Sequence, residues 1–148
     1  MTLTISDENY AELKAICKTE DENTIATKAI RLMLERIRKK TGKSIKHWFI
    51  TELGHENTER LHLHGIVWGI GVDKLIEEKW NYGITYTGNF VNEKTINYIT
   101  KYMTKIDEDH QEFVGKVLCS RGIGAGIQKE LTQKNINITK DKQSKHID

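Results

Sequence analysis

The segment from Arg60 to Gly65, Arg-Leu-His-Leu-His-Gly, places two histidines one residue apart within an apolar and β-branched run. In a β-strand, side chains two residues apart lie on the same face. The pattern therefore predicts a strand over residues 60–68 that presents His62 and His64 together, with the intervening leucines on the opposite face. Two neutral imidazoles placed this way can bind one divalent cation. A half-buried strand that merely exposes two histidines has the same pattern, so this segment alone does not decide.

The remaining chain predicts an α+β fold with one domain. Its 148 residues and 37% hydrophobic content suffice for a real core. Residues 46–53 and 60–68 are expected to form an antiparallel hairpin across a polar connection at 54–59. The other expected elements, from their periodicity and caps, are a strand at 1–5, a helix from Asp7 to about Lys18 capped by Ser6, a helix from Thr24 to about Lys40 capped by Asn23, a short helix at 73–79, a strand at 84–87, and a helix from Glu93 to about Ile106 capped by Asn92.

Glu52 is the acidic residue nearest the end of the first hairpin strand. If it lies opposite His62 or diagonal to His64, one carboxylate joins two imidazoles on one face and completes a cation site. A six-residue connection would instead place Glu52 opposite Leu61, so the hypothesis requires an odd-length connection or a bulge. A solvated carboxylate at the end of a strand is the alternative.

The expected helix at 93–106 presents two tyrosines and two lysines on one face. Tyr98, Lys101, Tyr102 and Lys105 occur at positions i, i+3, i+4 and i+7, which share a face in an α-helix. A separate isoleucine and methionine face can pack against a sheet. Tyrosine is a weak nucleophile at neutral pH unless nearby positive charge stabilises its phenolate, and a lysine one turn away supplies such a charge. The alternative is an aromatic pair covered by lysine stems.

Together these residues resemble the HUH endonuclease superfamily, and more closely the rolling-circle replication initiators of microvirus-like single-stranded DNA phages and plasmids. The resemblance rests on the opening strand, the block from Glu52 to Gly65, and the doubled Tyr-x-x-Lys helix. A downstream glycine motif at 120–124 also matches. The match covers residues 2–126.

The resemblance implies a central antiparallel sheet of about five strands, of ferredoxin-related topology, with helices on its outer face. It also implies Mn²⁺ or Mg²⁺ held by Glu52, His62 and His64. The implied activity is site-specific nicking and joining of single-stranded DNA at a replication origin, through a 5′-phosphotyrosyl intermediate that leaves a free 3′ hydroxyl. By position, Tyr98 and Tyr102 are the nucleophiles and Lys101 and Lys105 their adjacent cations.

Two other classes of function stay open. One is a noncatalytic module of the same fold that only binds single-stranded DNA. The other is a metal-dependent hydrolase in which the same three ligands activate water and no covalent intermediate forms. Retention of both tyrosines and both lysines on one helical face favours the nicking enzyme, because neither alternative requires them.

The remaining signals concern partners and location. The net charge of +2 does not by itself predict nucleic-acid binding, so clustered residues must carry that function; Arg60 and the motif of Arg121, Gly122 and Gly124 are weak candidates for DNA contacts. Two distant cysteines fit a reducing compartment, and no membrane segment or signal peptide is present, which predicts the host cytoplasm. Without a phosphate-binding helicase motif, unwinding is expected from a separate helicase together with the host replication machinery. Residues 1–130 are expected to form the catalytic domain and residues 131–148 a polar, flexible tail.

Overall fold

The computed structural model describes residues 1–54, 59–88, 91–97 and 112–123, and the account below concerns these residues. The elements are β1 (Thr2–Thr4), α1 (Asp7–Cys17), α2 (Glu22–Thr41), β2 (Lys46–Leu53), β3 (Leu61–Trp68), α3 (Val72–Lys79), β4 (Thr85–Tyr86) and β5 (Val117–Cys119). Residues 93–97 are also helical. The α+β class and the five-stranded sheet are confirmed, although the position of β5 was not predicted.

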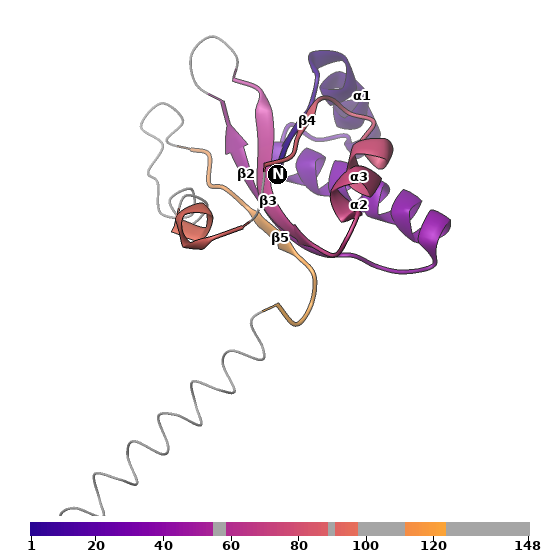
Figure 1. Ribbon diagram of the computed structural model, residues 1–148. Helices are drawn as coiled ribbons and strands as arrows, with labels where there is room; N and C mark the ends of the chain where they lie inside the picture. The colour runs from indigo at the N-terminus through magenta and orange to yellow at the C-terminus, as the bar shows by residue number, and fades with distance from the viewer. Residues whose placement is uncertain (55–58, 89–90, 98–111, 124–148) are drawn as a thin grey trace, which may run out of the picture.

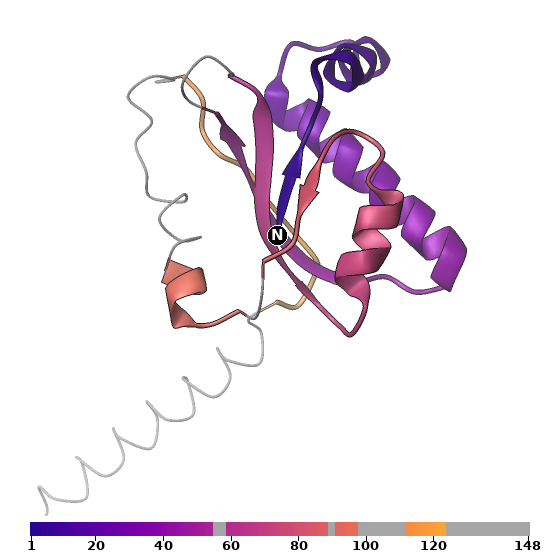
Figure 2. The same ribbon diagram turned by 45° about the horizontal axis from the view of Figure 1, so that its top comes forward.

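The five strands form one antiparallel sheet in the order β4-β1-β3-β2-β5. The first four strands thus have the 4-1-3-2 order of a ferredoxin-like split βαβ arrangement. Both crossovers, α1 with α2 between β1 and β2 and α3 between β3 and β4, lie on the same face of the sheet (Figure 1). The turned view in Figure 2 agrees. The fold therefore has one face covered by these helices and one face opposite to them, here called the open face.

The hydrophobic core lies between the sheet and these helices. Alternate residues of the strands point into it, including Leu3, Phe49 and Leu63, each fully buried. The facing residues of α2 recur at helical spacing; they are Ile25, Ala26, Ala29, Ile30, Met33 and Ile37. Because strand side chains alternate, the residues between those core positions are left for the open face.

The caps of the two long helices were predicted with unequal success. Ser6 accepts a hydrogen bond from the backbone N–H of Asn9, at 3.3 Å, and caps α1 as expected. The prediction that Asn23 caps the next helix was wrong, because α2 begins two residues earlier and Asp21 accepts from the backbone N–H of Thr24 at 2.8 Å. Asn23 instead donates to the carbonyl of Val114 and accepts from Thr51.

Replacing Asp21 by alanine is expected to lower the free energy of unfolding by about 1 kcal/mol, because the N-cap hydrogen bonds are lost. Hydrogen bonds from the side chain and the backbone of Thr24 lower the pKa of the Asp21 carboxyl. The stabilisation is therefore complete at neutral pH and lost as the pH falls through that lowered pKa, so wild type and variant should converge in acid. Urea titrations at several pH values measure both effects.

The matched control is Asp21→Asn, because asparagine caps helices about as well as aspartate. It should retain most of the stability at neutral pH. Equal losses in the alanine and asparagine variants would show that the carboxylate charge, and not the cap, stabilises α2.

Only the start of the expected helix at 93–106 falls within the described residues. Asn92 accepts a hydrogen bond from the backbone N–H of Thr95 at 3.0 Å, which is the expected cap. Residues 98–111, including all four tyrosine and lysine positions of the predicted site, lie outside the described residues, as do Gly124 and the expected tail at 131–148. Across the described residues, no helix has the length and apolar character needed to cross a membrane.

Candidate metal centre on the open face

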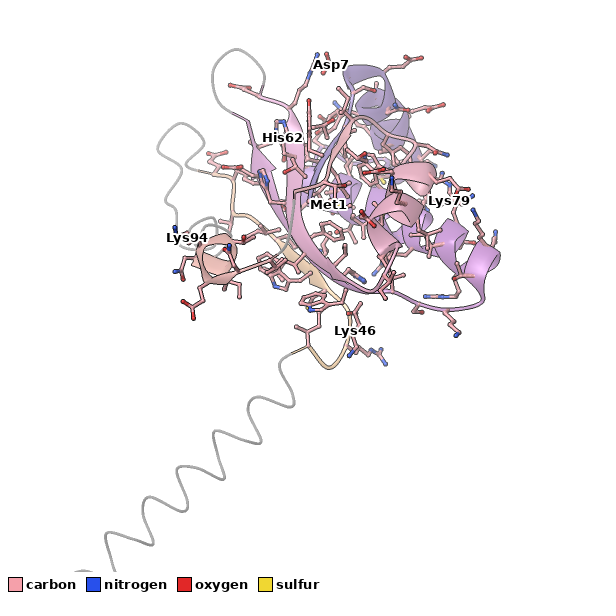
Figure 3. The ribbon with its side chains drawn as sticks, viewed as in Figure 1. Met1, Asp7, Lys46, His62, Lys79 and Lys94 are labelled. Atoms are coloured by element: carbon pink, nitrogen blue, oxygen red, sulfur yellow. The ribbon has the colours of Figure 1, made fainter. Side chains whose placement is uncertain are left out.

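The alternation along β3 divides its side chains as the sequence predicted. Leu61 and Leu63 are buried in the core, whereas His62 and His64 lie on the opposite, open face. Figure 3 labels His62 in the upper part of the sheet, where β2 and β3 run side by side. The strand therefore supports the core with one set of residues and presents two imidazoles with the other.

The register of the hairpin is the one that the hypothesis requires. Glu52 pairs directly with His62, and Leu53 pairs with Leu61. Because β3 begins at Leu61 and not at Arg60 as predicted, the connection comprises the seven residues 54–60. The odd length brings the carboxylate of Glu52 to the same face as both histidines.

Glu52, His64 and Thr2 form a chain of polar contacts across three strands. The Nε2 atom of His64 lies 2.9 Å from Oε2 of Glu52, and its Nδ1 atom lies 3.1 Å from Oγ1 of Thr2. The side chains of His64 and Glu52 are only 16% and 18% exposed. Contacts to both ring nitrogens hold the imidazole plane in one orientation, as outer hydrogen bonds do for metal-binding histidines.

Thr2 was not identified from the sequence. The alternation of the first strand places Thr2 and Thr4 on one face, but nothing in the sequence shows that this strand pairs with β3. The structure pairs Thr2 with His64 and Thr4 with His62. Only the tertiary pairing of β1 brings the threonine hydroxyl to the imidazole.

His62 stacks beside His64. Their ring centroids are 6.5 Å apart and their planes differ by 18°. Burial, and next electrostatic repulsion from the neighbouring imidazole, lower the pKa of His62, which favours its neutral form. A neutral imidazole has a lone pair available for a cation.

Two of the three proposed ligands, Glu52 and His64, already have the spacing that a divalent cation requires. A ligand-to-metal distance of about 2.1 Å gives neighbouring ligands of an octahedral ion a separation of about 3.0 Å. The 2.9 Å between Glu52 and His64 matches that separation. Within the described ranges, no three His, Cys, Asp or Glu side chains already converge on one point. His62 would have to rotate toward His64 to complete such a set, because their ring centroids are 6.5 Å apart.

The helical turn at 93–97 lies on the open side of the sheet, away from α1, α2 and α3 (Figures 1 and 2). A hollow of about 530 Å³ is lined by Met1, Gly65, Ile66 and Thr95, among others, and separates this turn from β3. The turn that leads into Tyr98 along the chain therefore lies on the side that carries the histidines.

Exposed aromatic side chains also occur on the open face. Trp68 and Tyr86 are 43% and 60% exposed, and their strand positions place them on the same side as His62 and His64. Aromatic rings in such positions can stack on unpaired bases. Trp80 is instead buried and donates its Nε1–H to the carbonyl of Thr4, so its role is structural.

The other candidate residues lie elsewhere. His47 faces the core side and stacks on Phe49, with ring centroids 6.0 Å apart, which agrees with its exclusion from the ligand set. Arg60 binds Asp7 through two hydrogen bonds of 3.0 and 2.8 Å. Arg121 and Gly122 lie in the turn after β5, and Gly122 has a left-handed backbone with φ of 80°.

Comparison with known proteins gives one family. Searches of curated proteins and of solved structures found no match. The family model for the replication-associated protein ORF2 matches residues 1–107, which include β1, both strands of the histidine hairpin and the positions of both tyrosines. Because this match covers more than half of the chain, the protein belongs to the replication-associated protein ORF2 family.

Proposed function

We propose that this protein is a rolling-circle replication initiator of the HUH endonuclease type, which nicks and rejoins single-stranded DNA at an origin. The observation that carries the proposal is the position of Glu52 on the open face, paired with His62 and 2.9 Å from His64, in a chain of a replication-associated family. The exposed rings of Trp68 and Tyr86 on that face suit unpaired bases.

In the proposed reaction, Glu52, His62 and His64 would hold Mn²⁺ or Mg²⁺. When bound, the ion would polarise the non-bridging oxygens of the scissile phosphate and offset the charge that develops on them. Thr2 would keep the ring of His64 in its binding orientation. The backbone around Gly65 anchors this strand, because the amide and carbonyl of Gly65 both bond to Met1 at 2.9 Å.

Tyr98 and Tyr102 would supply the nucleophiles. The phenolate oxygen of one tyrosine attacks phosphorus, a new phosphorus–oxygen bond forms, and the bond to the 3′ oxygen breaks. That oxygen takes up a proton and leaves as the free 3′ hydroxyl, while the 5′ phosphate remains on tyrosine. Lys101 and Lys105 would stabilise the phenolates. We place the activity in the host cytoplasm, with a separate helicase supplying single-stranded substrate.

The test of this proposal is covalent capture of DNA. The protein is mixed with end-labelled single-stranded oligonucleotides that tile its own replicon, with Mn²⁺ or with a chelator, and resolved on a denaturing gel. A metal-dependent protein–DNA adduct is expected from wild type and from each single tyrosine-to-phenylalanine variant, and none from the Tyr98→Phe/Tyr102→Phe variant.

The alternatives give different results in the same assay. Cleavage without an adduct, retained in the double variant, would identify a hydrolase that uses water. Binding without cleavage across the whole replicon would identify a noncatalytic DNA-binding module. Tyr82→Phe is a suitable control, because Tyr82 is buried beside Trp80 on the core side and should not affect adduct formation.

A further inference from the structure

A second groove lies between α2 and the edge strand β5, and none of its described lining residues belongs to the candidate metal centre. Its volume is about 750 Å³. Among the described residues, five cationic side chains and no aspartate or glutamate line it; the cations are Arg31, Arg38, Lys46, Lys116 and Arg121. Apolar residues of α2 and β5 form its floor. The chain's net charge is only +2, so this groove concentrates positive charge that the whole molecule does not have.

The groove cations form no ion pair with any described carboxylate. Elsewhere, lysines and arginines pair with carboxylates, as in Lys14–Glu20, Lys40–Glu78 and Arg60–Asp7. Among the residues that the structure describes, none of the five groove cations has such a partner. The charge of Lys116 contributes to lowering the pKa of Asp21, but the Asp21 carboxylate is already hydrogen-bonded as the cap of α2. The groove therefore presents an unbalanced positive field to solvent.

The lining also indicates what kind of anion the groove fits. Of the described lining residues, none is tryptophan, tyrosine or phenylalanine, and His47 is only 8% exposed. Grooves that hold single-stranded DNA combine cations with exposed aromatic rings on which bases stack. Here the cations occur without such rings, and the exposed rings of Trp68 and Tyr86 lie on the open face instead. This division suits a phosphate backbone whose bases are already stacked in a duplex.

The position of the groove relates it to the candidate metal centre. Lys46 begins β2 and pairs with Trp68, whereas Glu52 pairs with His62 six residues further along the hairpin. Figure 3 shows Lys46 and His62 toward opposite ends of these strands. At about 3.3 Å per residue, Lys46 and Glu52 are about 20 Å apart. A strand leaving a duplex at the groove could pass over Trp68 toward the histidines.

We propose that this groove binds the phosphate backbone of double-stranded DNA that adjoins the single-stranded segment on the open face. The inference rests on the proposed function only in taking DNA as the substrate. The chain's own residues 124–148 are not a complementary occupant, because they carry five lysines against three acidic residues. Binding of this kind is independent of base sequence and sensitive to salt.

The experiment measures DNA binding by fluorescence anisotropy in chelator, so that no metal-dependent chemistry contributes. The probes are a DNA hairpin with a single-stranded extension and the same extension alone. The Arg31→Gln/Arg38→Gln/Lys116→Gln variant is expected to bind the hairpin probe about 10- to 100-fold more weakly, with the salt slope reduced by about 2.7, and to bind the extension as wild type does.

The control variant is Lys14→Gln/Lys39→Gln/Lys74→Gln, which removes the same charge from positions outside the groove. It should leave hairpin affinity within about two-fold of wild type. Thermal melting confirms that both variants are folded. Equal losses in both variants would assign the effect to bulk charge and overturn the proposal. An unchanged groove variant, or one that loses affinity mainly for the single strand, would also overturn it.

The two proposals can fail separately. If wild type forms the tyrosyl adduct but the groove variant keeps its hairpin affinity, the groove assignment is wrong and the nicking activity stands. If no adduct forms on any origin fragment but the groove variant loses hairpin affinity selectively, the groove assignment stands and the nicking activity is wrong.

Discussion

Replacing Glu52 by glutamine is expected to lower the affinity for Mn²⁺ at least about 100-fold, since even outer contacts of metal ligands are worth 10- to 100-fold. Glutamine keeps the size of the side chain and can still bond to His64, but it removes the negative charge 2.9 Å from the imidazole. Adduct formation should fall about 1,000-fold, which corresponds to losing about 4 kcal/mol of transition-state stabilisation. Calorimetric titration with Mn²⁺ and gel quantification of the adduct measure the two effects.

The control for Glu52→Gln is Glu12→Gln, which changes charge equally at an exposed position of α1. It should alter neither metal affinity nor adduct yield. His64→Ala should reproduce the loss seen with Glu52→Gln, because both residues belong to the same cation site. If Glu52→Gln loses adduct formation while Mn²⁺ binds as before, Glu52 is not a metal ligand. It would then contact DNA or transfer a proton.

Replacing Gly65 by alanine is expected to destabilise the protein by about 3 kcal/mol or more, which is the upper range for overpacked cores. A Cβ atom at this position would lie 2.2 Å from Cδ1 of Phe49 and 2.4 Å from the carbonyl oxygen of Trp48. Phe49 is fully buried and the carbonyl belongs to the sheet, so neither can move cheaply. Because Gly65 directly follows His64, the shift should also weaken metal binding. Urea unfolding gives the stability change.

Gly88→Ala is the matched control, since no atom of the described residues lies within 4 Å of a Cβ atom built at Gly88. It should change stability by less than about 0.5 kcal/mol. Adding Phe49→Leu to the Gly65→Ala variant should recover only part of the loss, because the Trp48 carbonyl still obstructs the new methyl group. Full recovery would show that the ring of Phe49 is the sole obstacle.

Strong local patterns were sufficient to predict most of the fold. The bounds of β2 and the positions of the long helices followed from alternation and helical spacing, which are properties of a few neighbouring residues. The strand β5 was missed because three residues carry too little periodicity to distinguish a strand from a loop. Its assignment depends on pairing with Phe49 and its neighbours, a contact distant in the sequence.

For the candidate site too, local features could be predicted from the sequence, whereas features that depend on distant strand pairing could not. The shared face of His62 and His64 is a local property of one strand, and the pairing of Glu52 depended on a single residue in the length of the connection. The support of His64 by Thr2 comes from strands more than 60 residues apart, which no local pattern can reveal. The capping residue of α2 was misassigned because Asp21 and Asn23 are both good N-caps, and their tertiary partners decide between them.

The position of β1 inside the sheet, between β4 and β3, affects how the chain can assemble during synthesis. The neighbours of β1 are β3 and β4, so Leu3 is paired with Leu63 on one side and Thr85 on the other. At 5–20 residues per second, roughly 4 to 16 s separate the synthesis of Leu3 from that of Thr85. Throughout this interval β1 has no partner on one or both edges. The part of the sheet that adjoins the histidines is thus the first to be made and among the last to be enclosed, so both edges of β1 are paired only after Thr85 has been synthesised.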